Sequence, residues 1–281
     1  MKRVCISIGK PGEGCVNEDA VRAEECLIAV SDGAGGGGLF ADRWSRYLLD
    51  KLPTSPLCSA DEADAWLENI WEAFYNEYEQ VAVKAGGLLL DKFYDEGSFA
   101  TLVAVWKTTA CECRWITYGD SMAFHYNRKT KRLEHSFGRL ADFDNPPYLI
   151  NCKEELNKEG FHTGQFAIDE HSVIFVASDA LSHYILMMYE VMNHTDFEEE
   201  LLEALNKRSK NENYIRTAMS SMPFDFEKDV LDELLNSMNE EEVFTSLMKR
   251  LVDSGLAALD DYSLAKMASK IGADCPFFIH N

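Results

Sequence analysis

The chain has 281 residues and a formal net charge of −21, so it is long enough for a substantial core and is strongly acidic. The acidity argues against a nucleic-acid partner, because a phosphate backbone would be repelled. No apolar run in the sequence approaches the roughly 20 residues that span a bilayer, and the N-terminal apolar stretch is too short for a secretory signal. We therefore expect a cytoplasmic protein that binds neither nucleic acid nor membrane.

The first third of the chain alternates between strand and helix patterns. Residues 2–8 and 26–31 are short apolar runs typical of strands. Apolar residues recur with the helical period over Leu39–Leu52, which Pro53 ends, and again over Asp61–Lys84.

The middle of the chain changes character, because short β-branched or aromatic stretches follow one another with tight connections. This pattern predicts antiparallel strands. The expected strands cover Ser98–Lys107, Cys113–Tyr118, Met122–Asn127 and 133–137. The next segment, 138–168, is irregular and contains Pro146-Pro147, so we interpret it as a loop or flap.

The last third is mainly helical and begins and ends with strands. The expected strands are 172–177 and Tyr262–Ala268, and the expected helices are 181–193, 196–209, 227–238 and 240–254. Together the elements predict an α+β fold in which helices cover the outer faces of two packed antiparallel sheets, a four-layer α/β/β/α sandwich. With no linker or repeat in the sequence, residues 1–281 are expected to form a single domain with a candidate flap at 138–168.

The eight cysteines do not form a dense disulfide framework for a chain of this length. Cys111 and Cys113 alternate along an apolar run, so both are expected on the same side of a strand. A zinc site would need two further ligands at suitable spacing, and reduced thiols are the simpler interpretation.

Aspartates recur where apolar runs end. They lie in the segments 16–20, 30–36, 176–181 and 259–263. Each alone is explained by the capping of turns. Carboxylates at the ends of several strands can also converge at one edge of a sandwich, where hard oxygen ligands suit Mg²⁺ or Mn²⁺.

Six short motifs in order along the chain resemble those of the metal-dependent (type 2C) Ser/Thr protein phosphatases. They are Asn17-Glu18-Asp19, Ser31-Asp32-Gly33 with Gly35-Gly36, Gly97-Ser98-Phe99-Ala100-Thr101, Tyr118-Gly119-Asp120-Ser121, Ser178-Asp179-Ala180-Leu181 and Asp260-Asp261-Tyr262-Ser263. The resemblance covers residues 17–263 and implies a fold that agrees with the sandwich expected from the element order.

The resemblance also implies roles for individual residues. Two Mg²⁺ or Mn²⁺ ions would be held by Asp19, Asp32, Asp179 and Asp260, with Asp32 bridging both. Gly33 would offer its carbonyl to one ion, and Glu18 would act through water. Asp120 matches an aspartate that helps to hold a third, weaker metal in the family, and whether this chain has that third site is left open. Asp261 takes the place usually held by asparagine and would support the metal ligands without binding a metal itself.

The implied activity is hydrolysis of phosphoserine and phosphothreonine in proteins by a water that bridges the two ions. No cysteine lies in a CxxxxxR loop, which disfavours a cysteine-based phosphatase. The alternative is a phosphatase-like binding or regulatory module with weak catalysis. Two departures motivate it: Gly14 stands where the family has a phosphate-gripping arginine, and Ala180 replaces a glycine.

Further positions leave alternatives open. Lys10 is the nearest cation to Gly14, but it would act only as a point charge. His183 stands where another aspartate often supports the third metal, and a solvated histidine at a helix start is the simpler interpretation. Arg139 in the flap is either a phosphate contact or an ordinary surface residue.

The glycine run after Asp32 resembles a phosphate loop but lacks the Gly-Lys-Ser/Thr of a P-loop. Gly35 and Gly36 are expected to keep the backbone clear of the cleft, and Gly37-Gly38 have no explanation from the sequence. The acidic segments 196–205 and 226–242 are expected to be solvated helix faces, with a docking surface for a basic partner as the alternative.

Overall fold

The computed structural model describes residues 4–11, 15–36, 38–136, 138–206 and 210–268. Two five-stranded antiparallel sheets form its centre. The first contains, in spatial order, β1 (Cys5–Ile8), β12 (Tyr262–Lys266), β11 (Ser172–Ala177), β7 (Met122–Asn127) and β8 (Arg132–His135). The second contains β10 (Phe161–Ala167), β6 (Glu112–Tyr118), β5 (Leu102–Lys107), β3 (Leu27–Ser31) and β2 (Ala20–Ala23).

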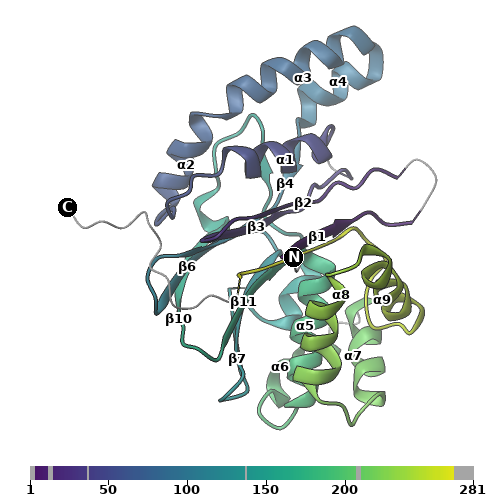
Figure 1. Ribbon diagram of the computed structural model, residues 1–281. Helices are drawn as coiled ribbons and strands as arrows, with labels where there is room; N and C mark the ends of the chain where they lie inside the picture. The colour runs from purple at the N-terminus through teal and green to yellow at the C-terminus, as the bar shows by residue number, and fades with distance from the viewer. Residues whose placement is uncertain (1–3, 12–14, 37, 137, 207–209, 269–281) are drawn as a thin grey trace.

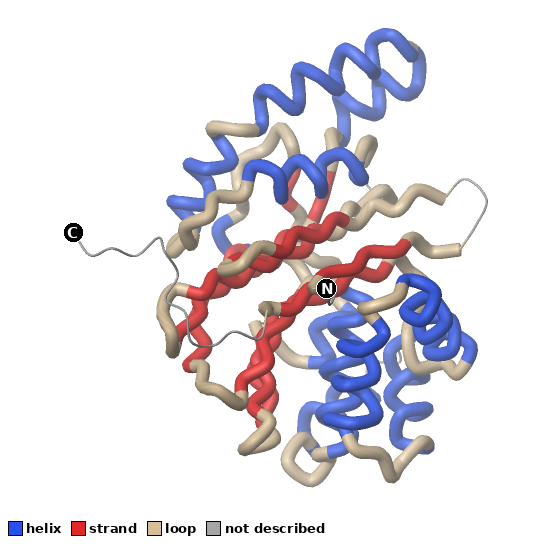
Figure 2. The backbone as a smooth tube through the Cα atoms, viewed as in Figure 1, coloured by secondary structure: helices blue, strands red, loops and turns tan. Residues whose placement is uncertain are grey.

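Helices cover the outer face of each sheet, as Figures 1 and 2 show. The second sheet is covered by α1 (Ala41–Lys51), α2 (Ala60–Glu68), α3 (Trp71–Ala85) and α4 (Gly87–Glu96). The first is covered by α5 (Asp179–Met192), α6 (Glu198–Asn206), α7 (Lys210–Ser220), the π-helical turn η3 (Phe226–Leu231), α8 (Asp232–Ser237) and α9 (Glu241–Asp253). The predicted four-layer sandwich is confirmed.

Three hydrophobic clusters separate the four layers, and β3 shows how the sequence specifies them. All five residues of β3 are buried. Ile28 and Val30 point between the sheets, whereas Leu27 and Ala29 pack against the helices α1 to α4. Because side chains alternate across a strand, a continuous apolar run supplies both faces of a sheet that is covered on both sides.

Residues 138–168 are more regular than the sequence suggests. They contain the 3-10 turns η1 (Leu140–Asp144) and η2 (Lys158–Gly160), and β9 (Ile150–Asn151), which pairs with β4 (Phe99–Ala100). Near their end, Phe161–Ala167 form β10, the edge strand beside β6. The interpretation of the whole segment as a loop was wrong for β10, whose mostly exposed side chains give no apolar run.

Several helical boundaries also differ from the prediction. The single helix expected over Asp61–Lys84 is two helices, α2 and α3, which are separated at Asn69-Ile70. The sequence did not predict β2, α4 or α7. The helix expected over 227–238 begins as the π-helical turn η3 and continues as α8.

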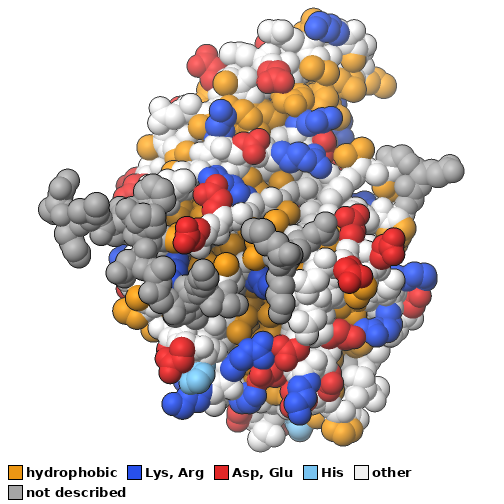
Figure 3. Space-filling view, in the orientation of Figure 1, with side chains coloured by type: hydrophobic (Ala, Val, Ile, Leu, Met, Phe, Trp, Pro, Cys, Tyr) orange, Lys and Arg blue, Asp and Glu red, His pale blue; other side chains and the backbone are white. Residues whose placement is uncertain are grey.

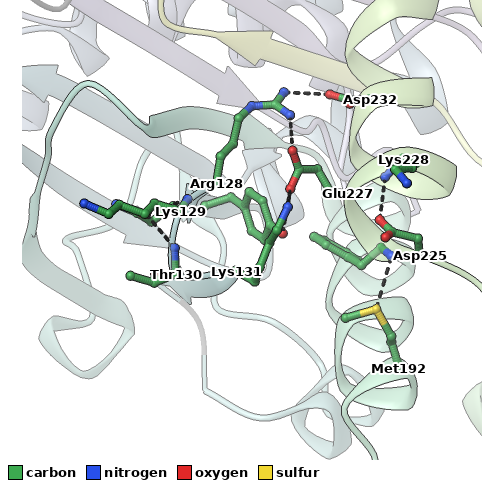
Figure 4. Close-up of polar contacts among 12 residues, drawn as sticks. Arg128, Lys129, Thr130, Lys131, Met192, Asp225, Glu227, Lys228 and Asp232 are labelled. Carbon is green, nitrogen blue, oxygen red and sulfur yellow. Dashed lines mark hydrogen bonds and ion pairs between the residues drawn. The ribbon is translucent and has the colours of Figure 1, made fainter.

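The acidic helices carry many of their charges in ion pairs. In Figure 4, Arg128 in the turn between β7 and β8 lies between Glu227 and Asp232, at 2.6 Å from each. Lys131 in the same turn pairs with Glu227. On the face in Figure 3, acidic and basic side chains are interspersed. These pairs support the solvated-face interpretation for 226–242, and they tie the first sheet to its helical layer.

Among the described residues, the free thiols include those of Cys15, Cys58, Cys111, Cys113 and Cys152. Cys26 is disulfide-bonded, so the expectation of reduced thiols was wrong for that residue. Cys113 is buried in β6 and Cys111 is exposed before it. Within the described ranges, none of the helices combines the length and hydropathy that a transmembrane span needs.

Candidate metal centre

The strand register places Asp19 beside Asp32. Asp19 directly precedes β2, Asp32 directly follows β3, and Ala20 pairs with Ser31 in the antiparallel ladder. In such a ladder the start of one strand lies opposite the end of the next. Two carboxylates 13 positions apart in the sequence therefore share one edge of the second sheet.

The first sheet brings further carboxylates to the same edge. Asp179 follows the end of β11 by two residues, and Asp260 precedes β12 by two. Because β11 and β12 pair antiparallel, with Ala177 opposite Leu264, these two aspartates also lie together. Asp120 occupies the tight turn between β6 and β7, where Gly119 has φ 101°.

The charges of these five aspartates influence one another, which shows that they form one cluster. The pKa of Asp32 is raised well above its usual value by burial and then by repulsion from Asp19, Asp179, Asp120 and Asp260. Burial, followed by repulsion from Asp179, raises the pKa of Asp19 to about 8 and that of Asp120 to about 7. Burial and then Asp260 raise the pKa of Asp179 to about 6.

Asp19 is the clearest sign that the cluster is built for a cation. Its side chain is 2% exposed, and neither carboxylate oxygen has a hydrogen-bond partner. Ser178 and Ser263 lie near enough to offset part of the rise in its pKa, yet neither makes a hydrogen bond of normal geometry with it. Burying an unpaired carboxylate costs several kcal/mol, a cost that a divalent cation would remove. The donor set, oxygen only, fits Mg²⁺ or Mn²⁺.

The oxygens of the clustered carboxylates do not all face one common point that a metal ion could occupy. In the described part of the chain, no three His, Cys, Asp or Glu side chains have an arrangement that would hold a metal ion as it stands. Local donors explain this: Asp179 Oδ1 accepts from the Ala180 N–H at 2.5 Å, and Asp260 Oδ1 accepts from the Asp261 N–H at 2.9 Å.

Glu18 and Gly33 lie at the entrance to this cluster. The pKa of Glu18 is raised by burial above all, and then by Asp261 and Asp42, while Lys10 and the Gly35 N–H lower it in part. Gly33 is enclosed, because a Cβ there would lie 2.6 Å from the Glu18 carbonyl and 2.8 Å from that of Ala41. The roles of Glu18 and Gly33 toward a metal remain predictions.

Two glycines of the run have a packing explanation, whereas a Cβ on Gly36 would meet open space, so the expected steric role of Gly36 was wrong. A Cβ on Gly35 would collide with the Glu18 carboxylate, so this glycine makes room for that side chain. A Cβ on Gly38 would lie 2.8 Å from the carbonyl of Gly97, where the Leu39 N–H also bonds. Gly38 therefore allows two loops to meet, a contact that the sequence did not predict. Gly37 lies outside the described residues.

Asp261 supports the site through the backbone. Its Oδ1 accepts from the Lys10 N–H at 2.7 Å, and its Oδ2 accepts from the Glu18 N–H at 2.8 Å. Both oxygens of a carboxylate accept, whereas an asparagine offers only one acceptor. This contact holds two separate segments at the rim and fits the supporting role implied by the resemblance.

The side chain of Lys10 contacts the cluster through Asp260. Its Nζ lies 3.4 Å from Asp260 Oδ1, and both side chains are partly exposed. Burial lowers the pKa of Lys10, but Asp260, Asp261 and Glu18 outweigh burial and the pKa is raised. Lys10 is therefore a firmly protonated cation at the rim. Gly14, the position of the family's arginine, lies outside the described residues.

A network of hydroxyl groups fixes the loops and was not predicted from the sequence. Thr101 Oγ1 accepts from the Asp32 N–H at 3.1 Å and lies 2.9 Å from Ser121 Oγ, which joins the Asp32 and Asp120 turns. Ser178 Oγ accepts from the Ser263 N–H at 2.9 Å and joins the two motifs of the first sheet. The serines adjacent to Asp32, Asp120 and Asp179 in the sequence are the signal that could have revealed the network.

Three further positions are settled by the structure. His183 is 6% exposed and packs edge-on against Phe143 and Tyr214, so the interpretation as a solvated histidine was wrong. Its burial lowers its pKa to about 4. Ala180 lies inside the first turn of α5, where glycine is not needed. Arg139 is an exposed residue paired with Glu203 at 2.5 Å.

Comparison with known proteins shows the fold. No family model matches the sequence, and no curated protein matches it. The crystal structure of the serine/threonine phosphatase Stp1 from Staphylococcus aureus is similar over 95% of each chain, with 14% identity and a TM-score of 0.50. The catalytic domain of the serine/threonine protein phosphatase PstP, solved with two manganese ions, is similar over 94% of this chain and 97% of that one, with 14% identity and a TM-score of 0.51. At these identities the likeness confirms the predicted fold.

Proposed function

We propose that this chain is a cytoplasmic, Mg²⁺- or Mn²⁺-dependent phosphatase that hydrolyses phosphoserine or phosphothreonine in proteins. The observation that carries the proposal is the buried cluster of Asp19, Asp32, Asp120, Asp179 and Asp260, in which Asp19 has no partner for either oxygen. The fold it shares with Stp1 and with the manganese-bound PstP catalytic domain supports the same function.

The roles of the residues follow from their positions. Asp19, Asp32, Asp179 and Asp260 would hold two ions, and Asp120 would serve a third position. Bound divalent cations would supply a nucleophilic hydroxide near neutral pH and offset charge on the phosphoryl oxygens. Glu18 would order water at the rim, the Gly33 carbonyl would complete the ligands, and Asp261 would hold the backbones of Lys10 and Glu18 in place.

The second candidate is a binding or regulatory module that retains the fold with little catalysis. Its motivation is that no described arginine side chain makes an ion pair or hydrogen bond with the clustered aspartates, and that these carboxylates are not yet oriented for a metal. The cost of the clustered charges favours the enzyme, because a module without metal would gain stability by losing them.

Hydrolysis of p-nitrophenyl phosphate with Mn²⁺ separates the two candidates. The enzyme predicts turnover that rises with Mn²⁺ and disappears with a chelator, measured together with Mn²⁺ binding by calorimetry. Tight Mn²⁺ binding without hydrolysis of this substrate or of any phosphopeptide would favour the module. If the protein neither bound Mn²⁺ nor hydrolysed these substrates, the proposed metal centre would be contradicted.

We further expect Lys10 to attract the substrate phosphate. Loss of its charge in Lys10→Met should raise KM for p-nitrophenyl phosphate about tenfold with little change in kcat, since a contact worth about 1.4 kcal/mol that is equal in ground and transition states changes only KM. Lys10→Arg should retain most of the affinity. The matched control is Lys129→Met, an exposed lysine in the turn between β7 and β8.

The same variants exclude a different role for Lys10. If the Lys10 amine only competed with the cation for Asp260, Lys10→Met would bind Mn²⁺ more tightly than the wild type and its KM for p-nitrophenyl phosphate would be unchanged. Calorimetry with Mn²⁺ and steady-state kinetics on the same preparations distinguish these outcomes.

A further inference from the structure

A groove of about 740 Å³ leads away from the candidate metal centre along residues 138–163. Asp120 and Gly119 form its inner end, so it is continuous with the aspartate cluster. The groove is lined by Pro146-Pro147 and Tyr148, and by the start of β10 with the neighbouring Trp115. A chain segment bonded to a phosphorylated residue at the metal centre would have this groove beside it.

Glycines give the groove its shape. A Cβ on Gly160 would lie 2.6 Å from Cβ of Tyr148, and a Cβ on Gly119 would lie 2.9 Å from the carbonyl of Tyr148. Tyr148 can therefore lie close to both loops. Its ring packs edge-on against Tyr118, at 6.3 Å between centroids, and its hydroxyl bonds Glu159 at 3.2 Å. The wall is thus held by contacts on two sides while 42% of Tyr148 stays exposed.

The chemistry of the lining restricts what can enter. Among the described lining residues, the large side chains are aromatic or prolyl, the charged ones are Asp120 and Asp142, and there is no lysine or arginine. Arg139, the nearest arginine in sequence, is directed to Glu203 and Asp142. Flat apolar walls favour large apolar side chains, and the described lining offers no lysine or arginine to pair with an acidic one.

We propose that this groove binds the polypeptide beside the phosphorylated residue and selects substrates with a large apolar side chain there over substrates with an acidic one. The inference rests on the proposed phosphatase function and specifies its substrate class. Tyr148 is a specificity-determining residue, because its exposed side chain lines the groove and its backbone lies against Gly119, next to Asp120.

A series of phosphothreonine peptides with Phe, Gly or Glu on both sides of the phosphothreonine tests the proposal. The wild-type protein should have a kcat/KM about tenfold higher for the Phe peptide than for the Glu peptide, about 1.4 kcal/mol. Tyr148→Ala should remove most of this preference. It should leave kcat/KM for p-nitrophenyl phosphate, which has no flanking polypeptide to occupy the groove, within about twofold of the wild-type value. Tyr148→Phe should keep the preference. Tyr94→Ala is the matched control, since Tyr94 is 45% exposed on α4 and outside the groove.

Other results overturn the proposal. If the wild-type protein hydrolyses all three peptides equally, it has no such selectivity. If Tyr148→Ala loses p-nitrophenyl phosphate turnover to the same extent as Phe-peptide turnover, the substitution has damaged the metal centre and Tyr148 does not determine specificity. Calorimetry with the unphosphorylated peptides measures the groove without hydrolysis. Phe-peptide binding by a chain that hydrolyses nothing would support the groove and reject the phosphatase, whereas hydrolysis without any peptide preference would do the reverse.

Discussion

Asp32→Asn is expected to abolish Mn²⁺-dependent turnover and, at the same time, to stabilise the metal-free protein. Asp32 interacts with four other aspartates, more than any other member of the cluster shows. A neutral amide would remove a bridging metal ligand. Loss of one group that stabilises charge in the transition state lowers kcat by roughly 10²–10³-fold. The same change removes the main source of repulsion in the folded state, worth about 1.4 kcal/mol for each unit of raised pKa.

Opposite changes in activity and stability make this test specific. We expect thermal unfolding in a chelator at pH 8 to show roughly 1–3 kcal/mol of added stability in Asp32→Asn. Addition of Mn²⁺ should raise the melting temperature of the wild type more than that of the variant. Asp91→Asn, at an exposed position on α4, controls for the loss of one charge. Equal destabilisation with and without Mn²⁺ would mean that Asp32 has only a structural role.

The aspartates could be predicted from the sequence because each is adjacent to a strand end. Strands were recognisable from their continuous apolar runs, such as β3 and β11, and their antiparallel order brought the ends together. The chemistry was then a property of residue type, since carboxylates are among the few side chains that bind Mg²⁺ or Mn²⁺. At these positions the local sequence pattern, an aspartate next to the end of an apolar strand, also marks the residues that would bind the metal.

Features that depend on distant partners could not be predicted in the same way. Lys10 meets Asp260 and Asp261 only because β1 pairs with β12 across the whole chain. His183 follows Asp179 by four residues, and residues of η1 and α7 bury it. α7 buries Ile215 and Ala218 in the core and was missed because its apolar residues are sparse.

The second large effect concerns pH and follows from the raised pKa values. A carboxyl group whose pKa is higher in the folded state holds a proton there that the unfolded chain has already released. The stability of the folded state therefore falls as pH rises through that pKa. For the metal-free protein this applies to Asp120, with a pKa of about 7, and Asp19, with one of about 8. We expect a loss of a few kcal/mol between pH 6.5 and 8, at up to about 1.4 kcal/mol per pH unit for each group.

Two other buried groups titrate and must be separated from the cluster. Burial and then Glu200 raise the pKa of Glu190 to about 8, so Glu190 contributes to the same loss. The lowered pKa of His183 makes it destabilising only as pH falls below about 6.5, outside the window. A Glu190→Gln variant removes the first contribution and should retain the larger part of the pH dependence.

Mn²⁺ distinguishes the cluster from every other titrating group. A divalent cation binds the carboxylates in their charged form, so its binding releases protons and its affinity rises with pH. With saturating Mn²⁺ the fall in stability between pH 6.5 and 8 should disappear in Glu190→Gln and persist in part in the wild type. Calorimetry in two buffers of different ionisation enthalpy measures the protons released. A pH dependence that Mn²⁺ leaves unchanged would assign the titration to groups outside the aspartate cluster, and the proposed metal centre would then lose its main support.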